Sequence, residues 1–272
     1  MNHILVGIDG SEWSEVAAHY ALDFAQAGNQ DVVGLAVIPP EIMQATGESA
    51  QSLASSSQIL EGEQFARRAV NDWFARTQYL CEQAGLCFAR AIEVGEPAER
   101  LATAAMTAWL TAFGAHGAKS PANAGGLGRV ATGLLRSAIK PMLVTRAEYQ
   151  PIQEVVLGWD GGPEAAHAVE MVFGLAKSSG WQVHLVSAGH RTSALAQSCS
   201  HLTEQMALAG VKADSHVISG DVLGVLRDAI DRFKPDLLVI GGHRKSVGER
   251  LVSGGVWEQI VAQAHVPVLL YR

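Results

Sequence analysis

Cysteine is scarce in this chain of 272 residues, and long apolar runs are absent. The three cysteines, Cys81, Cys87 and Cys199, show no metal-like spacing and cannot all pair. We therefore read them as reduced thiols of a cytoplasmic protein, with a redox role for Cys81 and Cys87 as the alternative. No run approaches the roughly 20 apolar residues that span a bilayer. The first residues lack the basic start and apolar core of a signal peptide, so we expect neither secretion nor membrane insertion.

Lysine and arginine are fewer than aspartate and glutamate, 20 against 27, so the formal net charge is −7. A nucleic-acid groove requires clustered lysine and arginine, so we expect no nucleic-acid partner. Hydrophobic residues make up 48% of the chain and charged residues 17%, which is typical of a well-packed globular protein. This length suffices for one large domain or for two of ordinary size.

Common catalytic motifs are missing as well. The chain has no Gly-x-Ser-x-Gly elbow, no Walker P-loop, no Gly-x-Gly-x-x-Gly turn and no His-x-x-x-His helix motif. We therefore assign no catalytic residue and no metal ligand, and we do not expect an efficient enzyme. Slow hydrolysis of a nucleotide stays open.

A strand, a glycine turn and a helix occur in the same order at two places in the chain. Residues 113–117 read Phe-Gly-Ala-His-Gly, and residues 240–244 read Ile-Gly-Gly-His-Arg. Each segment follows an apolar run, and each leads through a helix-like segment to a second apolar run. Such a turn directs backbone amides at a helix N-terminus, where they suit a phosphate.

The rest of the chain repeats too, which predicts two tandem domains at about 1–146 and 152–272. Asp9 and Asp160 follow the first strand of each half, and strands alternate with helices throughout. This alternation predicts a parallel sheet covered by helices on both faces. The first half contains an extra segment at about 41–62, rich in serine and glutamine. We consider it either a lid or partner-binding loop, or a disordered surface insertion.

Each half resembles a universal stress protein domain. The likeness is carried by Asp9 and Asp160, by the turns at 95–97 and 220–222, and by a proline before each final strand. The resemblance implies two doubly wound, mainly parallel five-stranded α/β domains of Rossmann-like type. It also implies that the final strands, 142–145 and 268–271, pair within one chain and form a pseudo-twofold unit. A homodimer of the whole chain is a further possibility that it leaves open.

Some members of this family bind ATP, with Mg²⁺, through Gly-x-x-Gly, nine residues, Gly and then Ser or Thr. Each half departs from this pattern at a different place. The first half has ten residues between Gly117 and Gly128, and Arg129 follows where a hydroxyl residue belongs. In the second half, Arg244 replaces the second glycine and Gly255 replaces the hydroxyl residue.

Twelve residues are therefore candidates for contact with an adenine nucleotide. They are Asp9, Val37, Gly114, His116, Gly117, Gly128 and Arg129 in the first half, and Asp160, Gly241, Arg244, Gly254 and Gly255 in the second. Each has a simpler interpretation. The glycines suit tight turns, the aspartates suit helix capping, the histidine suits loop packing, and the valine suits a core. Arg244 either occludes a phosphate or binds it.

Two functional classes follow from this comparison. One is a stress-response protein that has at most one well-formed ATP site, whose occupancy switches an unknown protein partner. The first half is favoured as that site because it retains more of the glycines. The other class is a nucleotide-free tandem scaffold, and a slow ATPase is a third alternative.

Overall fold

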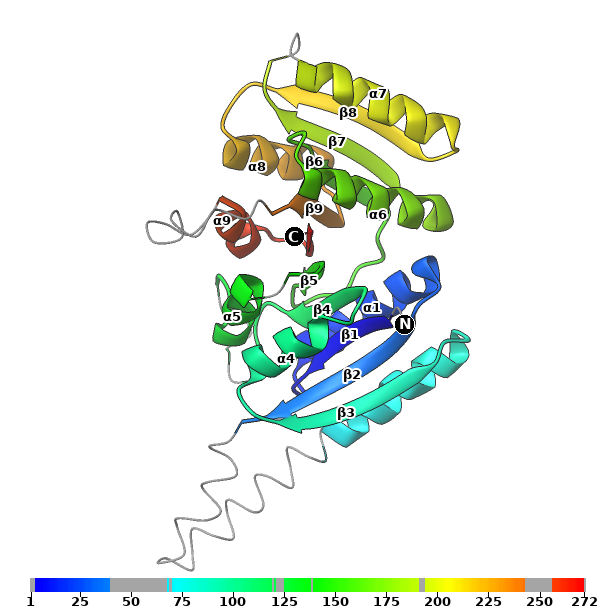
Figure 1. Cartoon of the computed structure of the whole chain (residues 1–272), viewed down its shortest axis with the longest axis vertical. Coiled ribbons are helices and arrows are strands. Elements are labelled where there is room, and N and C mark those ends of the chain that lie inside the picture. The colour runs from blue at the N-terminus through cyan, green and yellow to red at the C-terminus, as the bar shows by residue number, and fades with distance from the viewer. Residues whose placement is uncertain are drawn as a thin grey trace, which may run out of the picture. The chain divides into compact units, whose positions relative to one another are not determined.

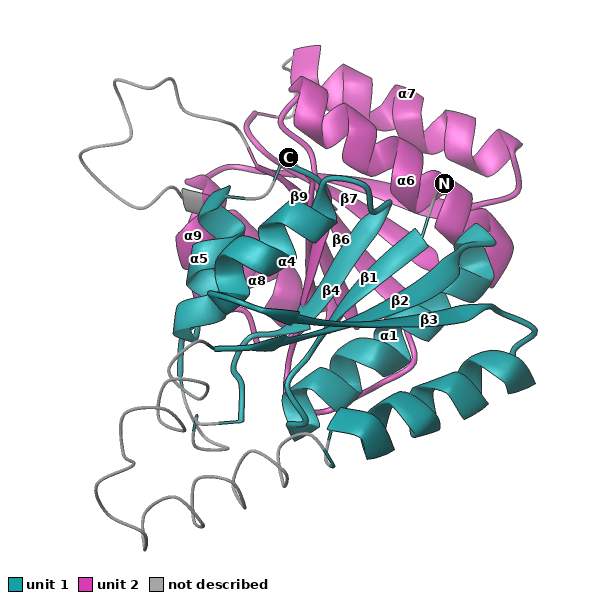
Figure 2. Cartoon of the chain, turned by 60° about the horizontal axis from the view of Figure 1, so that its bottom comes forward, with its two compact units in different colours: residues 1–140 teal, residues 141–272 magenta. Residues whose placement is uncertain are grey.

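The computed structural model describes residues 3–39, 68, 70–118, 120, 125–137, 139–190, 194–242 and 256–271. The chain divides into two compact units, residues 1–140 and 141–272, which Figure 2 shows in different colours. Strands and helices alternate along both, except that unit 2 begins with two consecutive strands (Figure 1). The predicted α/β class is confirmed. The insertion at 41–62 lies outside the described residues.

Unit 1 contains four strands and four helices among its described residues. Its elements are β1 (His3–Ile8), α1 (Glu12–Gly28), β2 (Asp31–Ile38), a helix at 70–83, β3 (Phe88–Val94), α4 (Pro97–Ala105), β4 (Leu110–Gly114) and α5 (Arg129–Ser137). The strands are hydrogen-bonded in the order β3-β2-β1-β4, and every neighbouring pair is parallel. Helix α1 and the 70–83 helix lie on one face of this sheet, and α4 and α5 on the other (Figure 1).

Local signals at the ends of α1 show why the chain forms this helix where it does. The Ser11 side chain accepts a hydrogen bond from the Ser14 amide at 3.2 Å, which satisfies one of the free amides of the first turn. At the other end, Asn29 adopts the left-handed conformation with φ 51°. Between them, Tyr20 and Phe24 are fully buried. Burial of this apolar stripe fixes α1 against β1 and β4.

Unit 2 repeats the pattern and adds the strand that closes the first half of the sequence. Its elements are β5 (Met142–Thr145), β6 (Glu154–Gly158), α6 (Pro163–Ser179), β7 (Gln182–Ala188), α7 (Ala194–Leu208), β8 (Lys212–Ile218), α8 (Val222–Phe233), β9 (Leu237–Gly241), α9 (Val256–Gln263) and β10 (Val268–Tyr271). The hydrogen-bonded order is β5-β10-β9-β6-β7-β8. All of these pairs are parallel except β5 with β10.

The two final strands pair as the sequence predicts. Val268 lies opposite Val144, and Leu270 lies opposite Met142, in an antiparallel register. All four side chains are fully buried. Because β5 and β10 each cover an edge of the other, neither presents an open row of backbone donors and acceptors on that side. This pairing is the local feature on which the predicted pseudo-twofold unit rests.

An arginine holds the end of α9 in place. The Arg146 guanidinium donates to the carbonyl oxygens of Val261, in the last turn of α9, and Val266. Burial lowers the pKa of Arg146 to about 10. Carbonyls at a helix C-terminus lack partners within the helix, and a cation satisfies them well. Among the described helices, none combines the length and hydrophobicity needed to cross a bilayer.

Candidate functional site

The strand order places the candidate residues at the carboxyl ends of the strands in each unit, which we call the carboxyl edge of the sheet. In unit 1 the chain runs outward from β1 through β2 to β3, and then returns to β4 on the other side of β1. The carboxyl ends of β1 and β4 therefore form the point where the winding direction reverses, which is where open α/β sheets bind ligands. Asp9 follows β1 at this point, and Gly114, His116 and Gly117 end or follow β4.

Asp9 joins the two loops that meet at this edge. Its Oδ1 accepts hydrogen bonds from the amide and the hydroxyl of Ser11, at the start of α1. Its Oδ2 accepts from the backbone amide of Ala118 at 2.8 Å, across 109 residues of sequence. The carboxylate therefore supports the capped turn before α1 and, at the same time, fixes the glycine loop after β4.

The two glycines of this loop are required by close neighbours. A Cβ atom at Gly117 would stand 2.5 Å from Asp9 Oδ2, and one at Gly114 would stand 2.6 Å from Trp13 Cβ. Real Cβ atoms do not approach other atoms so closely, so a side chain at Gly114 displaces the loop, and one at Gly117 displaces the Asp9 carboxylate. In unit 1 the second glycine thus leaves room for a carboxylate of the protein itself.

The loop is closed internally by its own backbone. The Gly128 amide donates to the Ala115 carbonyl at 2.8 Å, and the Ser120 amide donates to the Gly117 carbonyl at 2.8 Å. His116 is 9% exposed, and its ring meets Trp13 edge-on with 4.9 Å between centroids. Its Nε2 has no hydrogen-bond partner within the described residues. The His116 ring therefore lies in the turn against Trp13, at the carboxyl ends of β1 and β4.

The remaining candidates of unit 1 lie at the margins of this edge. Arg129 begins α5 and pairs with Glu96 at 3.3 Å, while 77% of its side chain stays exposed. An exposed pair of this kind is weak, so the guanidinium is available to another anion. Val37 is half-buried near the end of β2, where its neighbour across the sheet is Glu93.

Unit 2 places its candidates at the matching edge, after β6 and β9. Asp160 Oδ1 accepts from the Gly162 amide at 2.8 Å, a local turn at the N-terminus of α6. A Cβ atom at Gly241 would stand 2.6 Å from the backbone nitrogen of Ala165, so α6 packs directly on this glycine. Arg244, Gly254 and Gly255 lie outside the described residues.

Comparison with known proteins settles the family. The model of the universal stress protein family matches residues 1–146 and again residues 151–272. The chain belongs to the universal stress protein family. A curated relative, the universal stress protein Slr1230 of Synechocystis, is 29% identical over 155 residues. That match covers 54% of this chain, and the chain spans about half the length of the relative, 52%.

Solved structures agree with this universal stress protein fold over the full length. A universal stress protein from Archaeoglobus fulgidus superposes with a TM-score of 0.74 at 18% identity, covering 100% of this chain and 96% of the other. A functionally unknown protein from Pseudomonas aeruginosa superposes with a TM-score of 0.64 at 16% identity, covering 100% and 92%. At these identities the likeness concerns the fold alone.

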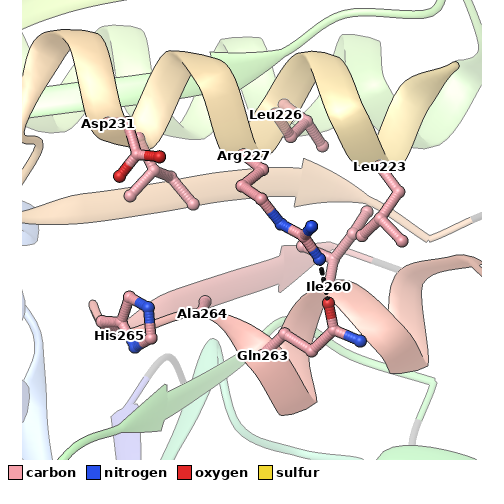
Figure 3. A pocket seen from close by; sticks show the side chains of 9 residues that line it. Leu223, Leu226, Arg227, Asp231, Ile260, Gln263, Ala264 and His265 are labelled. Atoms are coloured by element: carbon pink, nitrogen blue, oxygen red, sulfur yellow. Dashed lines mark hydrogen bonds between the residues drawn. The ribbon is translucent and has the colours of Figure 1, made fainter.

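A hollow between α8 and α9 is a separate feature of the second universal stress protein domain. Leu223, Leu226 and Ile260 form its apolar lining, and a hydrogen bond of 2.7 Å from Arg227 to Gln263 spans it (Figure 3). None of the candidate nucleotide contacts within the described part of the chain lines this hollow.

The sequence does not predict the role of Ala118 at the carboxyl ends of the unit 1 strands. Ala118 contributes its backbone amide to Asp9, and a backbone amide has no residue-type signal. The glycine at 117 was the available clue, because glycine permits a close approach of other groups. The partner of that approach could be found only from the fold.

Proposed function

We propose that this chain is a cytoplasmic universal stress protein whose first domain binds an adenine nucleotide, with ATP and Mg²⁺ as the expected ligand. Occupancy of that site would switch the binding of a protein partner. The observation that carries this proposal is the link from Asp9 to the Ala118 amide at the winding reversal. It holds the start of the glycine loop, at Gly117 and Ala118, in place before any ligand arrives, which lowers the entropy cost of binding.

Charge at this edge fits an anionic ligand held through a cation. Arg129 is the exposed basic group beside the N-terminus of α5, where helix amides favour a phosphate. Asp9 adds a negative charge on the loop itself, which opposes a bare phosphate. A Mg²⁺ ion on the phosphates would offset that repulsion. The proposal therefore includes Mg²⁺ with ATP.

A second candidate function is a nucleotide-free tandem scaffold, and a specific observation favours it. Three amides of the loop, those of Ala118, Ser120 and Gly128, already donate to acceptors within unit 1. Each of them would have to exchange its partner before it could bind a phosphate. A scaffold needs no such exchange, because the loop is then simply a closed turn.

Bound nucleotide is the first measurement that separates these two functions. Protein purified in the presence of Mg²⁺ and then denatured should release material with excess absorbance at 260 nm if the site is occupied. ATP added to stripped protein should also quench or enhance the fluorescence of Trp13, whose ring contacts His116. Absence of both signals at millimolar ATP would leave the scaffold as the function.

Substitutions in the two glycine loops then assign the site to a domain. Gly117→Arg introduces a side chain against Asp9, so it should abolish ATP binding if the first domain is the site. Arg244→Gly restores the family glycine in the second domain and should strengthen ATP binding there. If the wild-type protein binds ATP and the Arg244→Gly variant does not, the arginine itself holds the phosphate and the second domain is the site.

A further inference from the structure

Unit 2 carries a cluster of two histidines and two carboxylates that lies away from the candidate nucleotide site. Glu154 begins β6, His184 is in β7, and Asp214 and His216 are in β8. Strand register places all four on one face, because Val156 pairs with His184 and His184 pairs with Asp214. Residues two apart on a strand share a face, so Glu154 joins Val156, and His216 joins Asp214.

Two imidazole nitrogens converge on a single oxygen atom. His184 Nδ1 lies 2.7 Å from Asp214 Oδ1, and His216 Nε2 lies 2.8 Å from the same oxygen. The three ligand atoms all lie within 4.8 Å of one another. Two neutral imidazoles and one carboxylate are a donor set that suits divalent transition metals.

Glu154 orients the His184 ring so that its Nδ1 faces Asp214. Its Oε2 lies 2.9 Å from His184 Nε2, on the side of the ring opposite to Asp214. When His184 donates Nε2–H to Glu154, the lone pair of Nδ1 faces Asp214 Oδ1. A carboxylate that fixes the tautomer of a histidine in this manner is the usual outer partner of a metal ligand. Without a proton or a cation between them, Nδ1 and Oδ1 would repel each other.

The surroundings combine a packed wall with access from solvent. Phe233, at the end of α8, stacks on His184 with 4.2 Å between centroids and an angle of 14°, and its ring lies 4.6 Å from His216. The His184 side chain is 12% exposed, whereas that of Asp214 is 47% exposed on the edge strand. The aromatic ring thus fixes both imidazoles, and water can complete the coordination from the open side.

The first unit shows that the fold itself does not require these side chains. The pairing registers identify the matching positions of the two sheets. In unit 1, Leu5 pairs with Val33, and Val33 pairs with Ala89. In unit 2, Val156 pairs with His184, and His184 pairs with Asp214, so Val33 matches His184 and Ala89 matches Asp214. Ala91 takes the place of His216. One domain thus has Val, Ala and Ala where the other has His, Asp and His, on otherwise equivalent strands.

We propose that unit 2 binds a divalent transition-metal ion, of the Zn²⁺ type, through His184 Nδ1, Asp214 Oδ1 and His216 Nε2. Glu154 is a positioning residue that holds the His184 tautomer. Ligand atoms around a tetrahedral Zn²⁺ lie about 3.3 Å apart. The cluster can reach this geometry if its side chains rotate so that the ligand atoms move by about 1 Å. The two carboxylates of the cluster balance the charge of a divalent cation.

Metal titration of the full-length protein tests this proposal. Protein stripped with a chelator should bind one equivalent of Zn²⁺ at the cluster in calorimetry, and its Tm should rise with Zn²⁺ concentration. Co²⁺ should give the visible absorption of a low-coordinate nitrogen and oxygen site. Wild-type protein that binds no Zn²⁺, or that gains no Tm from it, would overturn the proposal.

Variants copied from the first domain locate the ion. The triple change His184→Val, Asp214→Ala and His216→Ala should abolish the bound equivalent, and His216→Ala alone should remove the Co²⁺ absorption even if the triple variant does not fold. Glu154→Gln should weaken Zn²⁺ binding about 10- to 100-fold, as loss of an outer partner does.

A matched control comes from another histidine of unit 2. His201, exposed on α7, bonds Gln205 and takes no part in the cluster, so His201→Ala should leave the affinity and the Co²⁺ spectrum unchanged. The proposal fails if the triple variant keeps the bound equivalent, or if His201→Ala removes it. Either result would assign Zn²⁺ to other surface histidines and leave the cluster as a set of hydrogen bonds.

Discussion

Replacing Gly117 by alanine should break the link between the two loops of the first domain. The backbone at this position is not left-handed, so alanine is tolerated by the main chain. Its methyl group would nevertheless stand 2.5 Å from Asp9 Oδ2. The carboxylate must then withdraw and lose its bond to the Ala118 amide, which is 2.8 Å long.

The size of the effect follows from that one hydrogen bond. A bond to a charged group contributes about 1.5–3 kcal/mol, and Asp9 is exposed, so we expect Gly117→Ala to lower the free energy of unfolding by about 1–2 kcal/mol. In an Asp9→Ala background the obstacle is gone. There the same change should be neutral or should stabilise the protein by about 0.4–1 kcal/mol, because alanine restricts the unfolded chain.

A double-mutant cycle in urea measures this coupling. Wild type, Gly117→Ala, Asp9→Ala and the double variant are unfolded with tryptophan fluorescence as the signal, and the four free energies are combined. We expect a coupling of at least about 1 kcal/mol between the two positions. The reasoning is wrong if Gly117→Ala is as destabilising without the Asp9 carboxylate as with it.

Three further predictions concern packing. In native protein, only the exposed Cys87 should react rapidly with a thiol reagent near pH 8, because the other two thiols are buried and burial raises their pKa; Cys87→Ser should abolish the fast phase. Gly241→Ala should lower the free energy of unfolding by about 1–3 kcal/mol, since its Cβ would stand 2.6 Å from a backbone nitrogen of α6. Gly174→Ala is the control: Gly174 lies in α6, where a Cβ atom would meet open space, so this change should not lower the free energy of unfolding. Arg146→Met should lower the free energy of unfolding by about 1–3 kcal/mol, seen as a lower urea midpoint, because the carbonyls of Val261 in α9 and of Val266 beyond it lose their donor.

Much of the fold could be predicted because its signals are local. Residues 88–94 suit a strand ended by the turn at Gly95, and they form β3, while Pro97 begins α4 as its fixed φ favours. The helical spacing of Val16, Tyr20 and Phe24 predicts a helix from about residue 14, and α1 begins slightly earlier, at Glu12, because Ser11 is the residue that caps it. The pairing of the final strands is predicted from the family resemblance, and the structure adds that it is antiparallel.

The site could be predicted only in part, because its contacts join distant segments. Sequence alone marked Asp9 as a helix-capping or ligand-binding residue, and the fold adds a bond to an amide 109 residues away. It marked Gly117 as a turn or a phosphate cradle, and the fold places a carboxylate oxygen over it. Neither contact has a spacing in the sequence that could identify its partner.

The metal-binding cluster shows the same division most clearly. By itself the sequence determined the tandem repeat and the alternation of strands and helices, because hydrophobic periodicity and turn residues are local properties. Only the tertiary structure decided that the side chains of Glu154, His184 and Asp214 meet. Parallel strands joined by helices bring together residues far apart in the chain, and strand register, rather than sequence spacing, selects which of them face one another.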